Sequence, residues 1–126
     1  MRSMRRILIV DDHAPFRSAA RQLLELGGFD VVGEAGDGDD ALEAVRRLRP
    51  EIVLLDVQLP GDDGFATCER ILDASGPGGI HTPVVILTSG RPVGTFRRRL
   101  ALSRAAGFIS KTDLTAARLA ALVSAT

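Results

Sequence analysis

The chain has 126 residues, of which 45% are hydrophobic and 25% charged, and its 16 basic residues balance its 16 acidic residues. This composition is typical of a single soluble globular domain and excludes a disordered or fibrous chain. The zero net charge gives no general case for nucleic-acid binding, and no apolar run approaches membrane-spanning length. Cys68 is the only cysteine, so no internal disulfide can form and we expect a cytoplasmic location.

Short apolar runs alternate with helical patterns along the whole chain. The runs predict buried strands at 6–10, 30–35, 51–56, 84–87 and 107–110. A helix is predicted after each strand. The first begins near Pro15 and ends at Gly27-Gly28, and the second begins at the capping carboxylates of 37–40 and ends before Pro50. The third follows Gly64, the fourth runs from about Gly94 to Ala106, and the fifth is capped by Thr112 or Asp113. Residues 75–83 form the longest predicted loop. Such alternation predicts an α/β fold, with a parallel sheet covered by helices on both faces.

Polar side chains follow four of the five predicted strands. Asp11 and Asp12 follow the first strand, Asp56 ends the third, Thr88 follows the fourth and Lys111 follows the fifth. The carboxyl ends of parallel strands share one edge of a sheet, so these groups converge if the first and third strands are neighbours. Close carboxylates repel one another unless a cation lies between them, and oxygen ligands favour Mg²⁺. The chemistry indicates a metal-assisted phosphoryl-transfer site with Asp56 as the nucleophile.

These residues lie in four segments that resemble the receiver domain of bacterial response regulators, the switches of two-component signalling. The segments are Ile-Leu-Ile-Val-Asp11-Asp12, Leu-Leu-Asp56-Val-Gln-Leu-Pro60-Gly-Asp-Asp-Gly64, Val-Ile-Leu-Thr88-Ser89 and Gly-Phe108-Ile-Ser-Lys111. Four segments in this order and spacing are a specific signal. The resemblance implies one domain over residues 1–126, with its core at about 5–123, and a doubly wound, flavodoxin-like sheet of five parallel strands in the order 2-1-3-4-5 with five helices.

The resemblance also implies how the phosphoryl group is received. Asp56 is expected to accept it from a histidine kinase in a Mg²⁺-dependent reaction. Asp12, Asp56 and the backbone carbonyl of Gln58 are the expected direct ligands of Mg²⁺, and Asp11 is expected to act mainly through water. Lys111 is expected to bind the phosphoryl group. The domain would then be a phosphoacceptor that assists its own phosphorylation and dephosphorylation, and not an enzyme.

Two further residues are implied as the switch. Thr88 is expected to move towards the phosphoryl group, and Phe108 to turn inward when Thr88 moves. Phosphorylation would thereby change an output surface made of the fourth helix, the fifth strand and the fifth helix. The arginines at 97–99 fall on this surface. They are read first as a solvated helix face and alternatively as part of a phosphorylation-dependent homodimer.

The segment Lys111-Thr-Asp-Leu114 is similar to the branch of receivers that precede a helix-turn-helix DNA-binding domain, and such an output domain is absent from this chain. Two other functions stay open. A phosphohydrolase of the haloacid-dehalogenase type uses similar groups, but it needs a second acid where this chain has Gln58. A receiver fold that binds partners without phosphorylation is the third reading.

Several residues have simple structural interpretations. Asp62 and Asp63 are predicted to form a turn and a helix cap without a ligand role, and Cys68 is predicted to be a core residue. His13 and His81 are predicted to lie in loops, too far apart in sequence to indicate a metal-binding pair.

Overall fold

Five parallel strands form the central sheet of the computed structural model, which describes residues 5–75 and 82–125. The strands are β1 Arg6–Val10, β2 Asp30–Ala35, β3 Ile52–Asp56, β6 Val84–Ser89 and β7 Gly107–Ser110. They lie in the order β2-β1-β3-β6-β7, which is the expected 2-1-3-4-5 order of the five main strands. The prediction of a doubly wound, flavodoxin-like α/β fold is therefore confirmed.

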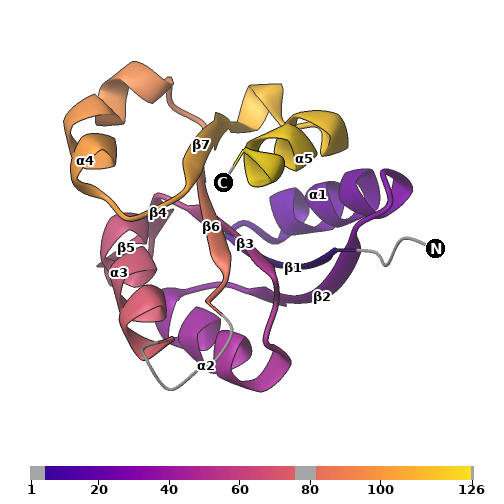
Figure 1. Cartoon of the computed structure of the whole chain (residues 1–126), viewed down its shortest axis with the longest axis horizontal. Helices are drawn as coiled ribbons and strands as arrows, with labels where there is room; N and C mark the ends of the chain where they lie inside the picture. The colour runs from indigo at the N-terminus through magenta and orange to yellow at the C-terminus, as the bar shows by residue number, and fades with distance from the viewer. Residues whose placement is uncertain (1–4, 76–81, 126) are drawn as a thin grey trace.

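Helices cover both faces of this sheet (Figure 1). Helices α1 (Ala14–Leu26) and α5 (Ala116–Ser124) lie on one face, and α2 (Gly38–Leu48) and α3 (Gly64–Ala74) lie on the other. Successive side chains of a strand point to opposite faces, so Ile7 and Ile9 pack with α1 and α5 while Leu8 and Val10 pack with α2 and α3. This is why residues 7–10 of β1 are all apolar.

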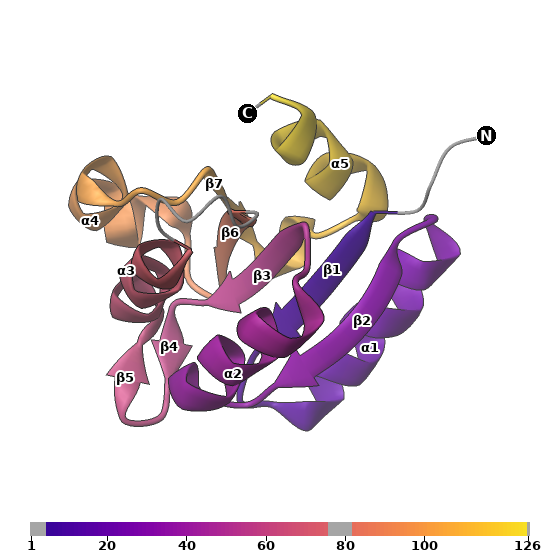
Figure 2. The same cartoon turned by 60° about the horizontal axis from the view of Figure 1, so that its bottom comes forward.

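A small hairpin follows β3 that the sequence did not predict. Strands β4 (Gln58–Leu59) and β5 (Asp62–Asp63) pair antiparallel and project beside α3 (Figure 2). The hairpin leads into α3 at Gly64, where a Cβ atom would overlap the carbonyl oxygen of Asp56 and lie 2.7 Å from the Cα of Val57. The α3 helix can therefore begin directly against the end of β3 only with glycine at this position.

The fourth predicted helix, from about 94 to 106, is wrong in length. A 3₁₀ turn η1 (Val93–Phe96) precedes a short helix α4 (Arg97–Leu102), and Ser103 is already extended. None of the α4 residues is buried, so little apolar packing supports a longer helix. The guanidinium of Arg104 instead binds Glu69 and Asp73 of α3, and the N–H of Ala106 donates to the carbonyl of Val85 in β6.

The predicted start of the last helix is also wrong. Lys111–Asp113 form a second 3₁₀ turn, η2, so neither Thr112 nor Asp113 caps α5. Thr115 is the N-cap, and its side chain accepts a hydrogen bond of 3.0 Å from the N–H of Arg118. The fourth strand extends beyond its predicted end, since Thr88 and Ser89 lie inside β6. Residues 76–81 of the predicted loop at 75–83 lie outside the described residues.

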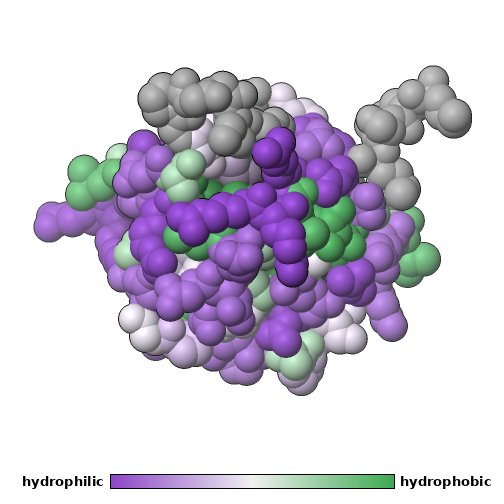
Figure 3. Space-filling view, turned by 90° about the horizontal axis from the view of Figure 1, so that it is seen from below, coloured by the Kyte–Doolittle hydropathy of each residue, from purple (hydrophilic) through white to green (hydrophobic). Residues whose placement is uncertain are grey.

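The surface matches the amphipathic pattern of the helices. Seen from the side on which α2 lies, most of the molecular face is hydrophilic and surrounds a narrower hydrophobic band (Figure 3). Cys68 is fully buried in the core, as predicted. Among the helices of residues 5–75 and 82–125, none has the length and apolarity needed to cross a membrane.

Candidate functional site

The polar groups at the strand ends converge at the carboxyl edge of the sheet. Asp11 directly follows β1, and Asp56 is the last residue of β3. Thr88 lies opposite Asp56 in the register of β3 and β6. Asp11, Asp56 and Thr88 are almost completely buried, with at most 4% of each residue exposed. Three neighbouring strands thus place buried polar groups at one edge of the sheet. This is the convergence that the sequence predicted.

Lys111 completes this group from the end of β7. Its Nζ lies 2.5 Å from Oδ2 of Asp11 and 3.4 Å from Oδ2 of Asp56. It also lies 4.3 Å from the centre of the Phe16 ring, whose electron-rich face favours a cation. Burial lowers the pKa of Lys111, but the carboxylates of Asp11 and Asp56 together raise it above the ordinary value. The side chain is therefore a fixed positive charge between two buried acids.

The pKa of Asp56 is raised well above the ordinary value of a carboxyl. Burial, reinforced by the charge of Asp11, raises its pKa to about 6, although the N–H of Gln58 and the ammonium of Lys111 act in the opposite direction. The Gln58 N–H donates to Oδ1 of Asp56 at 3.2 Å, which fixes the carboxylate at the start of the hairpin. A carboxylate held so far from water is stabilised when further positive charge is brought next to it.

The acids and a neighbouring histidine form a cluster that could hold a cation. Ligand atoms of Asp11, Asp12, His13 and Asp56 all lie within 4.8 Å of one another. Three ionised carboxylates and the ammonium of Lys111 carry a net charge of about −2, which a divalent ion would balance. Oδ2 of Asp11 is buried and is paired with the ammonium of Lys111, so one charge of the cluster is balanced within the protein and the other two are not. The donor set therefore fits a hard divalent cation such as Mg²⁺.

His13 is the member of this cluster that sequence reasoning missed. Its Nδ1 lies 3.0 Å from Oδ1 of Asp12 and 3.3 Å from Oδ1 of Asp11. In the sequence, His13 directly follows the two acids Asp11 and Asp12. The turn between β1 and α1 brings all three side chains to the same side, and adjacency to the acids was the available signal.

Other expected site groups stand as follows. The side chain of Gln58 is exposed, and the expected role of its carbonyl in metal binding stays a prediction. Asp63 caps α3 by accepting a hydrogen bond of 2.8 Å from the N–H of Ala66, as predicted. Asp62 pairs with Arg70 at 2.7 Å and lies outside the acidic cluster. The Oγ1 of Thr88 is buried and has no hydrogen-bond partner among the described residues.

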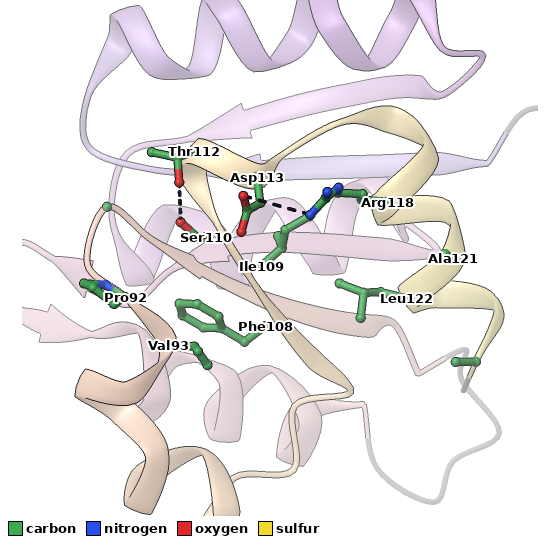
Figure 4. A pocket seen from close by; sticks show the side chains of 12 residues that line it. Pro92, Val93, Phe108, Ile109, Ser110, Thr112, Asp113, Arg118, Ala121 and Leu122 are labelled. Atoms are coloured by element: carbon green, nitrogen blue, oxygen red, sulfur yellow. Dashed lines mark hydrogen bonds and ion pairs between the residues drawn. The ribbon is translucent and has the colours of Figure 1, made fainter.

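Phe108 lies half-buried beside a large apolar pocket. The pocket has a volume of about 870 Å³ and lies between β7, η1, η2 and α5, and none of the acidic cluster lines it (Figure 4). Phe96 contacts Phe108 at a centroid distance of 6.0 Å and Phe65 at 6.1 Å. This row of three rings joins β7 to α3 through η1. Space beside the ring of Phe108 leaves it room for another orientation, as the expected switch needs.

The arginines of α4 differ in their surroundings. Arg99 binds Asp63 at 2.6 Å, and its guanidinium lies 4.3 Å from the centre of the Phe65 ring. Arg97 and Arg98 are exposed to solvent, in agreement with the simple reading of a solvated face.

Comparison with known proteins gives consistent relatives. The chain is 40% identical over 108 residues to the transcription regulator BvgA of Bordetella pertussis, covering 86% of this chain and 49% of BvgA. It is 38% identical over 109 residues to the response regulator GacA of Pseudomonas aeruginosa, covering 86% of this chain and 49% of GacA. The chain thus spans about half the length of the curated relatives it matches.

Solved structures agree in fold. The signal receiver domain of the response regulator NarL from Mycobacterium tuberculosis superposes with a TM-score of 0.80 at 30% identity, covering 97% of this chain and 98% of that one. A two-component response regulator of the LuxR family from Aurantimonas superposes with a TM-score of 0.82 at 29% identity, covering 98% of this chain and 84% of that one. The model of the response regulator receiver domain matches residues 7–124. The chain therefore belongs to the family of response regulator receiver domains.

Proposed function

We propose that this chain is a phosphorylation-controlled switch of two-component signalling, with Asp56 as its phosphoacceptor. One observation carries the proposal: buried Asp56 lies opposite the unpartnered hydroxyl of Thr88 and within 3.4 Å of the ammonium of Lys111. An unsatisfied buried hydroxyl is costly in a resting protein. Its place across from a carboxylate is understandable if it donates to an oxygen atom that arrives with the phosphoryl group.

The proposed step is the transfer of a phosphoryl group from the phosphohistidine of a histidine kinase. A carboxylate oxygen of Asp56 attacks phosphorus, the new O–P bond forms, and the P–N bond to the donor imidazole breaks. The imidazole leaves with a proton from solvent. Lys111 lies where it can balance the charge on the phosphoryl oxygens, and Thr88 can donate a hydrogen bond to one of them.

A divalent cation, for which we propose Mg²⁺, would be held by Asp12, Asp56 and the carbonyl of Gln58, with Asp11 acting mainly through water. When bound, it would supply positive charge to the phosphoryl oxygens and lower the pKa of Asp56. The carboxylate of Asp56 is then ionised and nucleophilic at neutral pH. The buried carboxylates and their excess negative charge support this part of the proposal.

The proposed output is a changed surface rather than a chemical product. Movement of Thr88 towards the phosphoryl group would shift β6 and the segment after it, and the pocket beside Phe108 offers space for that ring to respond. We include a phosphorylation-dependent homodimer through α4, β7 and α5. Since the relatives named as transcription regulators are about twice as long, we also infer that the switch controls a DNA-binding output domain absent from this chain.

Intact mass spectrometry tests the proposal directly. The protein is incubated with acetyl phosphate, with and without Mg²⁺, and Asp56→Asn is the control. Since the chain has no Trp or Tyr, mass replaces intrinsic tryptophan fluorescence as the readout. One added phosphoryl group that requires both Mg²⁺ and Asp56 is the expected result. Steady release of phosphate without an adduct would favour the hydrolase, and neither adduct nor turnover would favour the binding module.

A further inference from the structure

We propose that His13 is a nitrogen ligand of the cation at this site, so that the site prefers Mn²⁺, a transition-metal ion that also accepts imidazole, to Mg²⁺. The inference rests on the proposed cation site and adds to it a ligand of a different chemical type. It predicts which metal the protein takes when several divalent ions are present.

The distances around His13 are those of neighbouring ligands on one metal ion. In an octahedral site with bonds of about 2.1 Å, adjacent ligand atoms lie roughly 3.0 Å apart. Nδ1 of His13 lies 3.0 Å from Oδ1 of Asp12 and 3.3 Å from Oδ1 of Asp11. An ion can therefore contact the imidazole and a carboxylate with adjustments of a few tenths of an ångström.

The backbone holds His13 in this position. Its N–H donates to Oδ1 of Asp11 at 2.8 Å, and Asp11 is itself completely buried. His13 is the N-cap residue of α1, but its side chain makes no capping hydrogen bond. The imidazole is therefore free of a helix-capping role, and 70% of the side chain is exposed to solvent.

A second observation points to a ligand at the same place. Oγ1 of Thr88, opposite Asp56 in the sheet, is fully buried and lacks a hydrogen-bond partner among residues 5–75 and 82–125. Lys111 supplies one positive charge against the three carboxylates of the site, so the cluster retains an excess of negative charge. A bound divalent ion would satisfy this excess, and the imidazole lies within reach of it.

The nitrogen ligand decides selectivity. Mg²⁺ binds oxygen ligands and gives up its waters reluctantly, whereas imidazole suits transition metals. Mn²⁺ has the same octahedral preference and accepts both kinds of ligand. Removing the imidazole is thus expected to weaken Mn²⁺ binding by about tenfold or more. Mg²⁺ binding, which relies on the oxygen atoms, is expected to change by less than about twofold.

The test measures metal binding without phosphorylation. Mn²⁺ affinity is measured by electron paramagnetic resonance, and Mg²⁺ affinity is measured by its competition with Mn²⁺. Coordination by nitrogen is detected as ¹⁴N modulation of the Mn²⁺ signal. All measurements are made at about pH 8, where free imidazole is neutral. The wild type is compared with His13→Ala, and His81→Ala removes the other histidine as the matched control. Asp56→Asn reports whether the ion occupies the proposed site.

We expect ¹⁴N modulation in the wild type and in His81→Ala, and its loss in His13→Ala together with the lower Mn²⁺ affinity. Modulation absent from the wild type, or kept in His13→Ala, overturns the inference. The wild-type spectrum alone decides the first of these, even if a variant fails to fold. The proposed function fails separately: in that case neither ion binds, or binding is unaffected by Asp56→Asn.

Discussion

Replacing Asp56 with asparagine is expected to stabilise the metal-free protein, although it removes the residue on which the proposed function depends. Burial raises the pKa of Asp56 to about 6, from its ordinary value of 3.8. A carboxyl with a raised pKa favours the fold while it is protonated. This stabilisation is complete below about pH 4 and is lost as the pH rises through about 6. Asparagine is neutral at every pH, so the variant does not lose this unfolding free energy as the pH rises.

The rise of this pKa from 3.8 to about 6 sets the size of the effect. One unit corresponds to about 1.4 kcal/mol, so ionisation of Asp56 costs the wild type about 3 kcal/mol of unfolding free energy at neutral pH. For a domain of this length that is a difference in Tm of about 10 °C. The advantage of Asp56→Asn should therefore be small near pH 4 and should grow until about pH 7.

Urea unfolding followed by circular dichroism, in EDTA and over pH 4 to 8, measures this difference. Asp12→Asn is the matched control, since Asp12 is exposed and the same change should there have little effect. Adding Mg²⁺ at roughly ten times its Kd should return about 1.4 kcal/mol to the wild type and less to Asp56→Asn. A variant that is less stable than the wild type at pH 7, or a gap independent of pH, would refute the reasoning.

Three further predictions concern the framework around the site. Gly64→Ala should destabilise the protein by about 2–3 kcal/mol in urea unfolding, because its Cβ would meet the backbone of β3. Gly94→Ala, whose Cβ would have no atom within 4 Å, should be neutral or slightly stabilising. Equal effects of the two substitutions would contradict the close approach of Gly64 to the end of β3. Thr115→Ala should lose about 1 kcal/mol through the missing N-cap while Thr115→Ser keeps it, and the comparison of their urea midpoints checks this. Burial raises the pKa of the Cys68 thiol to about 11, so a thiol reagent at pH 8 should modify the native protein far more slowly than the unfolded chain, and fast native labelling would argue against the packing.

Local signals in the sequence determined the strands and their chemistry. The run 7–10 of β1 is apolar at every position because both faces of the strand are covered, and such a run can be recognised without knowing its neighbours. The acids and the lysine that follow these runs predicted a polar site at one edge of the sheet. The register of β3 and β6, with Asp56 opposite Thr88, agrees with that prediction.

Contacts between distant segments decided the rest, and the sequence does not display them. The strand order came from family resemblance, since β3 pairs with β1 through hydrogen bonds between backbone groups that all residues share. Helix α4 ends early because no residue of it is buried, and the following Arg104 instead binds Glu69 and Asp73 of α3, which lie 35 and 31 residues earlier in the chain. The acids Asp11 and Asp56 are 45 residues apart in the chain, and only the pairing of β1 with β3 brings them into one cluster with His13. Apolar periodicity is a property of one segment, whereas charge pairing and ligand geometry are properties of the folded chain.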